Sequence, residues 1–183
     1  MTAAIDEVCD SDFMQERKVK RDKGRRGRGR SIGRGKVDYW CRYGLNAKTT
    51  VLMEAKQDWI RWCPNKEDCT VYSSAVEHHQ EAVQQVGSVF GKMEHTTGNL
   101  YGVALTVLPI FVRYDSADDP QVTLRSRQLA AVAEKAREKL NGHAVGVFAM
   151  PRAAAVTVEF DSGTVESNPG VVLVWSVFKF SRK

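Results

Sequence analysis

The spacing of apolar residues switches several times along the chain between the period of a β-strand and that of an α-helix. Alternation and short apolar runs predict strands at 36–43, 49–59, 101–114, 144–149, 153–160 and 171–180. Pro109 has no N–H to donate, so it predicts a bulge or an edge position late in the strand at 101–114.

Helical spacing predicts two helices between these strands. The first opens at the capping box of Ser74 and Glu77, ends near Gly91, and buries a face formed by Val76, Val83, Val86 and Phe90. The second starts at Asp119-Pro120, stops at Asn141-Gly142, and carries a buried stripe of Leu129, Val132, Ala136 and Leu140. Residues 2–20 fit a third helix, with Ile5, Val8, Phe13 and Met14 as its apolar stripe.

This order of elements predicts a mixed α/β (α+β) fold, in which a mixed central β-sheet is flanked by helices. A chain of 183 residues is most simply one domain, 1–183, with a real core. No apolar run approaches the ~18–20 residues of a membrane span, and acids interrupt the apolar residues of the N-terminus, unlike a secretory signal. A soluble cytoplasmic protein without a membrane partner is the expectation.

Basic residues are concentrated in one segment. The net charge is +5, but residues 17–36 hold eleven Lys and Arg and one acid, Asp22. Because the segment is also rich in glycine, it is predicted to be a mobile basic Arg/Gly-rich loop. Guanidinium groups bind phosphates bidentately, so the loop predicts salt-sensitive contact with nucleic acid; its candidate residues are Arg25, Arg26, Arg28, Arg30 and Arg34. The alternative is a solvated segment with no fixed partner.

The strands at 36–43 and 49–56 are predicted to form an antiparallel hairpin centred on Asn46, where Gly44-Leu45-Asn46-Ala47 resembles a turn. This register sets Asp38 opposite Glu54, and directly opposed side chains lie ~5 Å apart. Val51, Met53 and Ala55 would face the core, whereas the acids would share the opposite face with Thr50, Leu52 and Lys56. Two such carboxylates can bind a hard cation such as Mg²⁺. The alternative is a solvated face of Lys–acid pairs.

The series of Asp38, fifteen intervening residues, and Glu54-Ala55-Lys56, followed by an amphipathic helix and a buried strand, resembles the PD-(D/E)XK nuclease superfamily. That superfamily has the restriction-endonuclease-like fold. The resemblance implies that Asp38, Glu54 and the carbonyl of Ala55 bind Mg²⁺ or Mn²⁺, and that Lys56 is the catalytic lysine. Val37 stands where the family has proline, and residues 115–183 carry no part of the resemblance.

Many members of this superfamily add an acid from the first helix and a polar residue from the helix after the motif. Glu7 or Glu16 would be the first of these, and Gln80 or Gln84 the second. The resemblance implies a metal-dependent nuclease that cuts DNA in preference to RNA, with a homodimer as one arrangement. The alternatives are a nucleic-acid-binding protein without catalysis, which uses the Arg/Gly-rich segment, and an accessory subunit whose basic loop meets an acidic protein.

The other motifs in the sequence are weaker indications of a functional site. Cys9, Cys41, Cys63 and Cys69 match no zinc spacing, so free thiols are favoured over a knuckle of Cys69 with His78 and His79. Gly24 to Ser31 resembles a phosphate-binding loop, but residues 17–23 are charged and cannot form the buried strand that such a loop follows. Trp40, Trp59 and Trp62 are candidates for stacking on bases, although core or edge packing is favoured for Trp59.

Overall fold

The structure is a computed structural model that describes residues 11–19, 35–43, 49–90, 98–114, 124–150, 157–159 and 165–180. For residues 11–19, 35–38, 40, 42, 43, 90, 114 and 157–159 it describes the backbone alone. Within these ranges no helix is long and apolar enough to cross a membrane.

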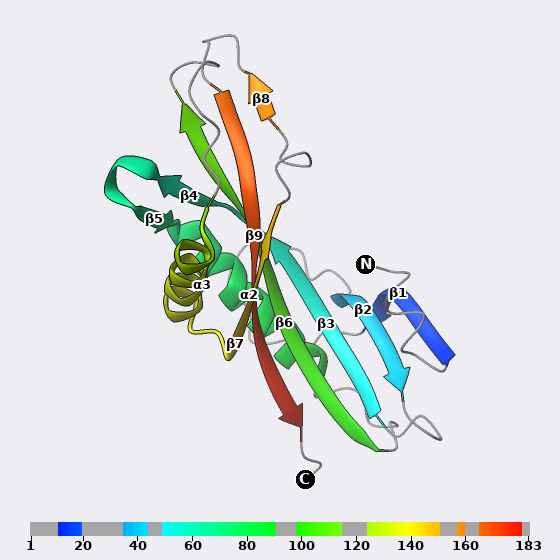
Figure 1. The fold of residues 1–183 in the computed structure, drawn as a ribbon. Coiled ribbons are helices and arrows are strands. Elements are labelled where there is room, and N and C mark those ends of the chain that lie inside the picture. Colours follow the sequence, from blue (N-terminus) through cyan, green and yellow to red (C-terminus); the bar gives the residue numbers. More distant parts are fainter. Residues whose placement is uncertain are drawn as a thin grey trace, which may run out of the picture. The chain divides into compact units, whose positions relative to one another are not determined.

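In the described chain, two α-helices stand between strands in the sequence, as the hydrophobic pattern predicts (Figure 1). In chain order they are β1 Ser11–Val19, β2 Gly35–Tyr43, β3 Thr49–Gln57, β4 Ile60–Cys63, the 3-10 turn η1 Pro64–Lys66, β5 Asp68–Val71, α2 Ser73–Phe90, β6 Asn99–Tyr114, α3 Ser126–Leu140, β7 Ala144–Ala149, β8 Thr157–Glu159 and β9 Val165–Phe180.

In the described part of the chain, nine strands form one sheet, in which β1, β2, β3, β6, β4 and β5 follow one another. The last strand, β9, pairs with β6, β7 and β8. Most pairs are antiparallel, but β4 runs parallel to β6. The predicted mixed α/β fold with a mixed sheet and helices is therefore confirmed.

The chain divides into two compact units, which are described separately. The first comprises Met1–Ala55, Glu81–Leu105 and Ser176–Lys183, and the second comprises Lys56–Gln80 and Thr106–Trp175. Four elements, β3, α2, β6 and β9, continue from one unit into the other.

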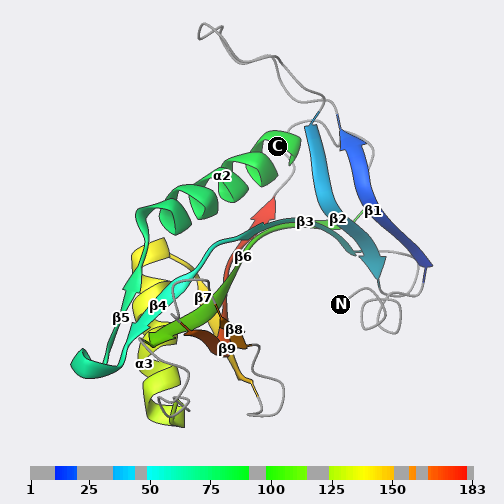
Figure 2. The same ribbon diagram turned by 90° about the horizontal axis from the view of Figure 1, so that it is seen from above.

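In the first unit, β1, β2 and β3 form an antiparallel meander, and the second half of α2 lies against β6 (Figure 2). Gly102 of β6 marks this contact, because a Cβ built there would lie 2.2 Å from Cγ1 of Val86. A glycine on the strand thus allows the helix to approach closely. The buried residues of this half of the helix are Ala82, Val86 and Val89.

In the second unit, α3 packs its apolar stripe on the core formed by β4, β5, β6 and β9. The predicted stripe is confirmed, since its members and Ala133 are all buried: Leu129, Val132, Ala136 and Leu140. On the strand side the core includes Ile60, Trp62, Leu108, Ile110, Val172 and Val174. Full burial of one such aliphatic side chain stabilises the fold by about 1.5–3 kcal/mol, so this layer is the main source of cohesion in the unit.

The helix α3 begins later than predicted and ends where predicted. Its first residue is Ser126, where the backbone amide of Arg125 donates to Oε1 of Gln128 (2.9 Å) and caps the helix; the predicted start at Asp119-Pro120 lies outside the described residues. Asn141 takes the left-handed conformation (φ 53°, ψ 41°), and the N–H of Gly142 donates to the carbonyl of Arg137 (2.9 Å). This is the geometry with which an Asn-Gly pair stops a helix.

Two predictions about helices were wrong. Residues 11–19 form the strand β1, not part of a helix, because they pair with β2; residues 2–10 lie outside the described chain. The buried stripe of α2 is Ala75, His79, Ala82, Val86 and Val89, whereas Val76 and Val83 are half-buried. Val86 is common to the predicted and observed stripes, and small residues and a histidine take much of the contact face.

Of the two alternatives predicted for Pro109, the edge position was wrong, and the bulge stays a prediction. The residue is not on an edge strand, since β6 has neighbours on both sides, and its effect falls on the neighbouring strand instead. The N–H of Asp58 donates to the carbonyl of Val107 (3.1 Å), as in a parallel ladder. The next bond of that ladder would use the N–H of residue 109, which proline lacks. The bond that is missing is the one to the carbonyl of Asp58, and the break between β3 and β4 at Asp58-Trp59 lies at this point. Separately, the N–H of Trp59 donates to Oδ1 of Asp58 (2.7 Å).

Candidate functional site

The predicted hairpin register is confirmed over the paired residues of β2 and β3. Tyr39 pairs with Met53, Cys41 with Val51, and Tyr43 with Thr49, all centred on Asn46. The observed pairs end at Tyr39 and Met53. One further step in the same register would set Asp38 opposite Glu54, so this part of the prediction is an extension of an observed pairing.

The assignment of the two faces of β3 was wrong. Thr50 and Leu52 are fully buried and Glu54 is 4% exposed, whereas Val51, Met53 and Ala55 are only half-buried. The acid therefore lies on the more deeply buried face of its strand. Among the described residues, the helix α2 lies along one face of this part of the sheet (Figure 2), so alternate positions of β3 differ in burial. Lys56, two residues after Glu54 on the same strand, is half-buried.

The strand β1 places a third acid, Glu16, next to Asp38 in the sheet register. Gln15 pairs with Tyr39 and Arg17 with Val37, which places Glu16 at the register position opposite Asp38. Glu16 thus stands on a strand, not on the first helix as the family pattern suggested. The same ladder sets Lys18 directly opposite Lys36. Like charges at directly opposed positions destabilise a strand pair. A bound ligand of opposite charge would reduce this repulsion.

The basic segment joins the paired ends of β1 and β2. Val19 pairs with Gly35, and the connection between them contains Arg25, Arg26, Arg28, Arg30 and Arg34, which lie outside the described residues together with Glu7. Gly35 is three residues from Asp38 on β2, a separation of about 10 Å along a strand. The connection therefore leaves the sheet close to the position of Asp38.

The two glutamine candidates and the zinc alternative receive no structural support. Gln80 and Gln84 are exposed on α2. Nδ1 of His78 lies 2.9 Å from Oδ2 of Asp58, and Nδ1 of His79 shares a hydrogen bond with Oγ1 of Thr106 (2.8 Å). In the part of the chain that the structure describes, no three His, Cys, Asp or Glu side chains form a group that could hold a metal ion; the side chains of Glu16 and Asp38 are not among those described.

Cys41, Cys63 and Cys69 are not in disulfides, in agreement with the prediction, and Cys9 lies outside the described residues. Burial raises the pKa of the Cys69 thiol to about 11. Beside it, Nζ of Lys135 donates to the carbonyl of Cys69 (2.8 Å) and to both carboxylate oxygens of Asp68 (2.7 and 2.9 Å). A thiol with this pKa stays protonated and unreactive at neutral pH, so the cluster is structural.

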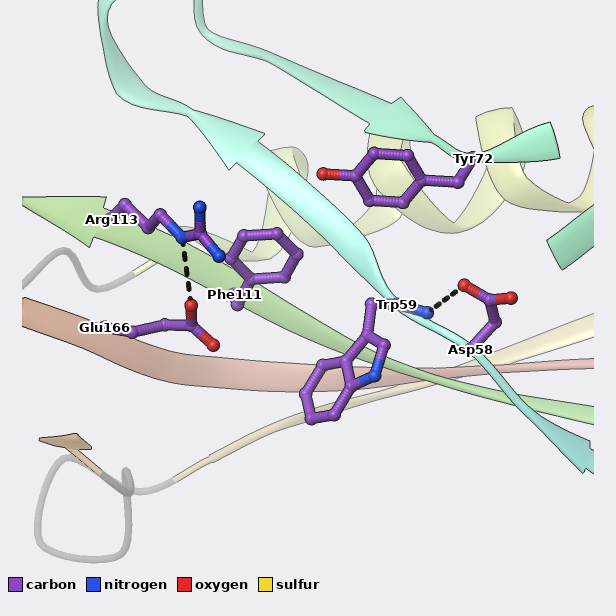
Figure 3. A pocket seen from close by; sticks show the side chains of 6 residues that line it. All are labelled: Asp58, Trp59, Tyr72, Phe111, Arg113 and Glu166. Atoms are coloured by element: carbon purple, nitrogen blue, oxygen red, sulfur yellow. Dashed lines mark hydrogen bonds and ion pairs between the residues drawn. The ribbon is translucent and has the colours of Figure 1, made fainter. Parts of the chain in front are cut away.

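The second unit contains a pocket that the sequence did not reveal. It has a volume of about 260 Å³ and is lined by Asp58, Trp59, Tyr72, Phe111, Arg113 and Glu166 (Figure 3). Trp59, for which core or edge packing was favoured, is 41% exposed, whereas Trp62 is buried in the core. The sequence signal nearest to the pocket is Pro109, which interrupts the ladder beside Asp58-Trp59 before it resumes at Ile60 and Ile110.

Aromatic rings and one ion pair define the interior of this pocket. The rings of Tyr72 and Phe111 are nearly parallel (6° apart, centroids 6.5 Å apart), and Trp59 meets Phe111 edge to face (76°, 6.3 Å). The guanidinium of Arg113 lies 5.4 Å from the centroid of Phe111, and its Nε donates to Oε2 of Glu166 (3.1 Å). These contacts fix a planar cation beside an aromatic cluster (Figure 3).

Comparison of the chain with protein-family models, with curated proteins and with solved structures finds no significant match.

Proposed function

We propose that this protein is a metal-dependent nuclease whose site lies on the β1–β2–β3 meander. The observation that carries the proposal is the register of these strands. It sets like-charged residues opposite one another, with Glu16 opposite Asp38 and Lys18 opposite Lys36. A row of acids attracts a cation, and a row of lysines attracts a polyanion. A divalent metal ion bound to a nucleic acid would meet both requirements, because the ion would bind the acids and the phosphates would bind the lysines.

The carboxylates would hold the ion. Extension of the β2–β3 register by one step adds Glu54 to the row of Glu16 and Asp38. Carboxylate oxygens are the ligands that Mg²⁺ and Mn²⁺ prefer, and the carbonyl of Ala55 is adjacent in the chain. Glu54 is 4% exposed, so an ion at this carboxylate would be held among protein groups. When bound, a divalent cation polarises a phosphate oxygen and activates a water molecule.

The lysine and arginine side chains would act on the substrate. Lys56 follows Glu54 by two residues on β3, so strand alternation directs both to one face. There its ammonium group would orient the attacking water or offset charge on the phosphate. The arginines between Val19 and Gly35 would bind flanking phosphates. DNA is the favoured substrate.

The finer fold assignment belongs to the same proposal. A restriction-endonuclease-like core is supported by two features: α2 and β6 both come after β3 in the chain, and β6 lies next to β3 in the sheet. The chain departs from the simplest version of that order, because the hairpin of β4 and β5 intervenes between β3 and α2.

The test uses isosteric variants and two readouts. Glu54→Gln, Asp38→Asn and Lys56→Ala are compared with Glu81→Gln, a matched control because Glu81 is an exposed acid on α2. Plasmid and single-stranded DNA are incubated with Mg²⁺, Mn²⁺ or EDTA, and Mn²⁺ binding is measured by electron paramagnetic resonance. We expect metal-dependent cutting that is lost in the three site variants, and weaker Mn²⁺ binding in Glu54→Gln and Asp38→Asn. Retention of both cutting and Mn²⁺ affinity in Glu54→Gln contradicts the proposal.

A second function, nucleic-acid binding without catalysis, is favoured by the concentration of eight Lys and Arg between residues 20 and 34. In that case the wild-type protein binds DNA with strong salt dependence, cuts nothing with either metal, and binds equally well as Glu54→Gln. The same experiment therefore separates the two functions.

A further inference from the structure

The pocket beside Trp59 exposes aromatic rings that a folded domain normally buries. Trp59 is 41% exposed and Tyr72 is 37% exposed, although Phe111 between them is only 6% exposed. All three come from separate segments of the second unit, namely the β3–β4 break, the residue before α2, and β6. Exposed aromatic rings that converge on one cavity, with a buried ring as the floor, form a surface on which another planar group can stack.

The polar groups of the pocket offer both donors and acceptors. Glu166 fixes the guanidinium of Arg113 by the 3.1 Å bond to Nε, which leaves the terminal N–H groups as donors. The carboxylate of Glu166 retains lone pairs beyond the one used by Arg113, whereas both oxygens of Asp58 are engaged, one by the N–H of Trp59 and the other by Nδ1 of His78. A planar ligand with acceptors on one edge and amino groups on another would match this set.

The charges exclude a phosphate as the group that enters. Two carboxylates and one guanidinium line the pocket, so an anion would meet net repulsion. The volume of about 260 Å³ lies just under the ~300–1,000 Å³ typical of pockets for whole drug-sized ligands. A single uncharged ring system suits both the charge and the size.

We propose that this pocket binds one unpaired purine base of a single-stranded nucleic acid. The base would stack on Trp59 and be hydrogen-bonded by Arg113 and Glu166. It would meet Tyr72 edge to face, since the Tyr72 ring is nearly parallel to Phe111 and Phe111 is steeply inclined to Trp59. Guanine presents the acceptors that arginine recognises and also amino and imino donors. Adenine presents one of each on its edge. Thymine lacks an amino group and is the weaker ligand. The class of ligand rests on the proposed function, whereas the existence of a stacking pocket does not.

The experiment measures binding without cleavage. Fluorescein-labelled single-stranded 10-mers of mixed purines, of thymidine and of abasic sites have the same backbone charge, and their binding is followed by fluorescence anisotropy in EDTA. Stacking contributes about 1–3 kcal/mol per base, which corresponds to roughly 5- to 150-fold in affinity at 1.4 kcal/mol per tenfold. We expect the purine 10-mer to bind tighter than the abasic one by a factor in this range, and the thymidine 10-mer to lie between them.

The variants assign this difference to the pocket. Trp59→Ala and Tyr72→Ala should each reduce the ratio of purine to abasic affinity, and Trp59→Phe should restore most of it, which a merely unfolded variant would not do. Phe148→Ala is the matched control, because Phe148 is 62% exposed but does not line the pocket. Equal binding of purine and abasic 10-mers to the wild type, or an unchanged ratio in Trp59→Ala, overturns the proposal. If the protein binds in a base-dependent way but never cuts DNA, the pocket proposal is supported and only the nuclease proposal is refuted.

Discussion

The contact between β6 and α2 makes a sharp prediction for Gly102→Ala. The new Cβ would lie 2.2 Å from Cγ1 of Val86 and 2.7 Å from Cε2 of Phe180. Because carbon atoms in contact prefer about 3.5–4.0 Å, the helix and strand must move apart. Val86 relieves little of this clash, since a β-branched side chain in a helix has one strongly preferred rotamer.

Overpacking of this kind costs about 1–3 kcal/mol. A change of 1 kcal/mol shifts the melting temperature of a chain of this size by roughly 2–4 °C, so we expect a decrease of about 2–12 °C. Thermal unfolding followed by far-ultraviolet circular dichroism measures it. The double variant Gly102→Ala/Val86→Ala should be more stable than the sum of the two single changes predicts, because the second change removes the methyl group that clashes.

Gly87→Ala is the matched control. Gly87 lies in α2, and no atom lies within 4 Å of the position that an added Cβ would take, so alanine should stabilise the helix by about 0.5–1 kcal/mol. The same chemical change is thus expected to have opposite signs at two glycines. A Gly102→Ala protein as stable as the wild type would refute the close helix–strand contact.

Three more predictions concern the second unit. Asn141→Ala should destabilise the protein by about 1–2 kcal/mol in urea titrations, because alanine disfavours the left-handed conformation, whereas Asn141→Gly should not. Burial lowers the pKa of His79, so on acidification the unfolded chain binds the proton before the folded protein does. The free energy of unfolding should therefore fall as pH drops below about 6.5, the ordinary pKa of histidine. The urea midpoint of His79→Gln should depend less on pH over this range. The hydrogen bond from Lys135 holds the pKa of Asp68 below its ordinary value. The stabilisation that the Asp68 carboxylate gains from Lys135 is therefore present above the ordinary pKa of Asp68 and is lost as pH falls through the lowered pKa. In Lys135→Met, an NMR titration should find the pKa of Asp68 raised toward 3.8.

The parts of the fold that depend on local pattern could be predicted from the sequence. Turn residues and alternation were enough to predict the β2–β3 register, and helical spacing predicted the buried stripe of α3. The strand β1 was missed because its residues mix acids, bases and apolar side chains without strict alternation, and its identity depends on pairing with β2. Local sequence cannot report such a partner.

The candidate site was only partly predictable for the same reason. Glu54 and Lys56 were found from their spacing, but the burial of Glu54 depends on which face of the strand is covered, and this is a tertiary property. Glu16 gained its position from the second ladder of the meander. The aromatic pocket combines residues 58, 59, 72, 111, 113 and 166, and no motif joins positions so far apart.

The missing N–H of Pro109 has a consequence beyond its own strand. Position 109 offers no donor to the carbonyl of Asp58 on the adjacent segment, and the strands β3 and β4 are interrupted at Asp58-Trp59. Two residues that line the cavity thus stand at an interruption opposite a residue that does not line it. An ordinary amino acid at position 109 would offer the missing donor, so a variant there tests whether the interruption shapes the cavity, separately from variants of the lining.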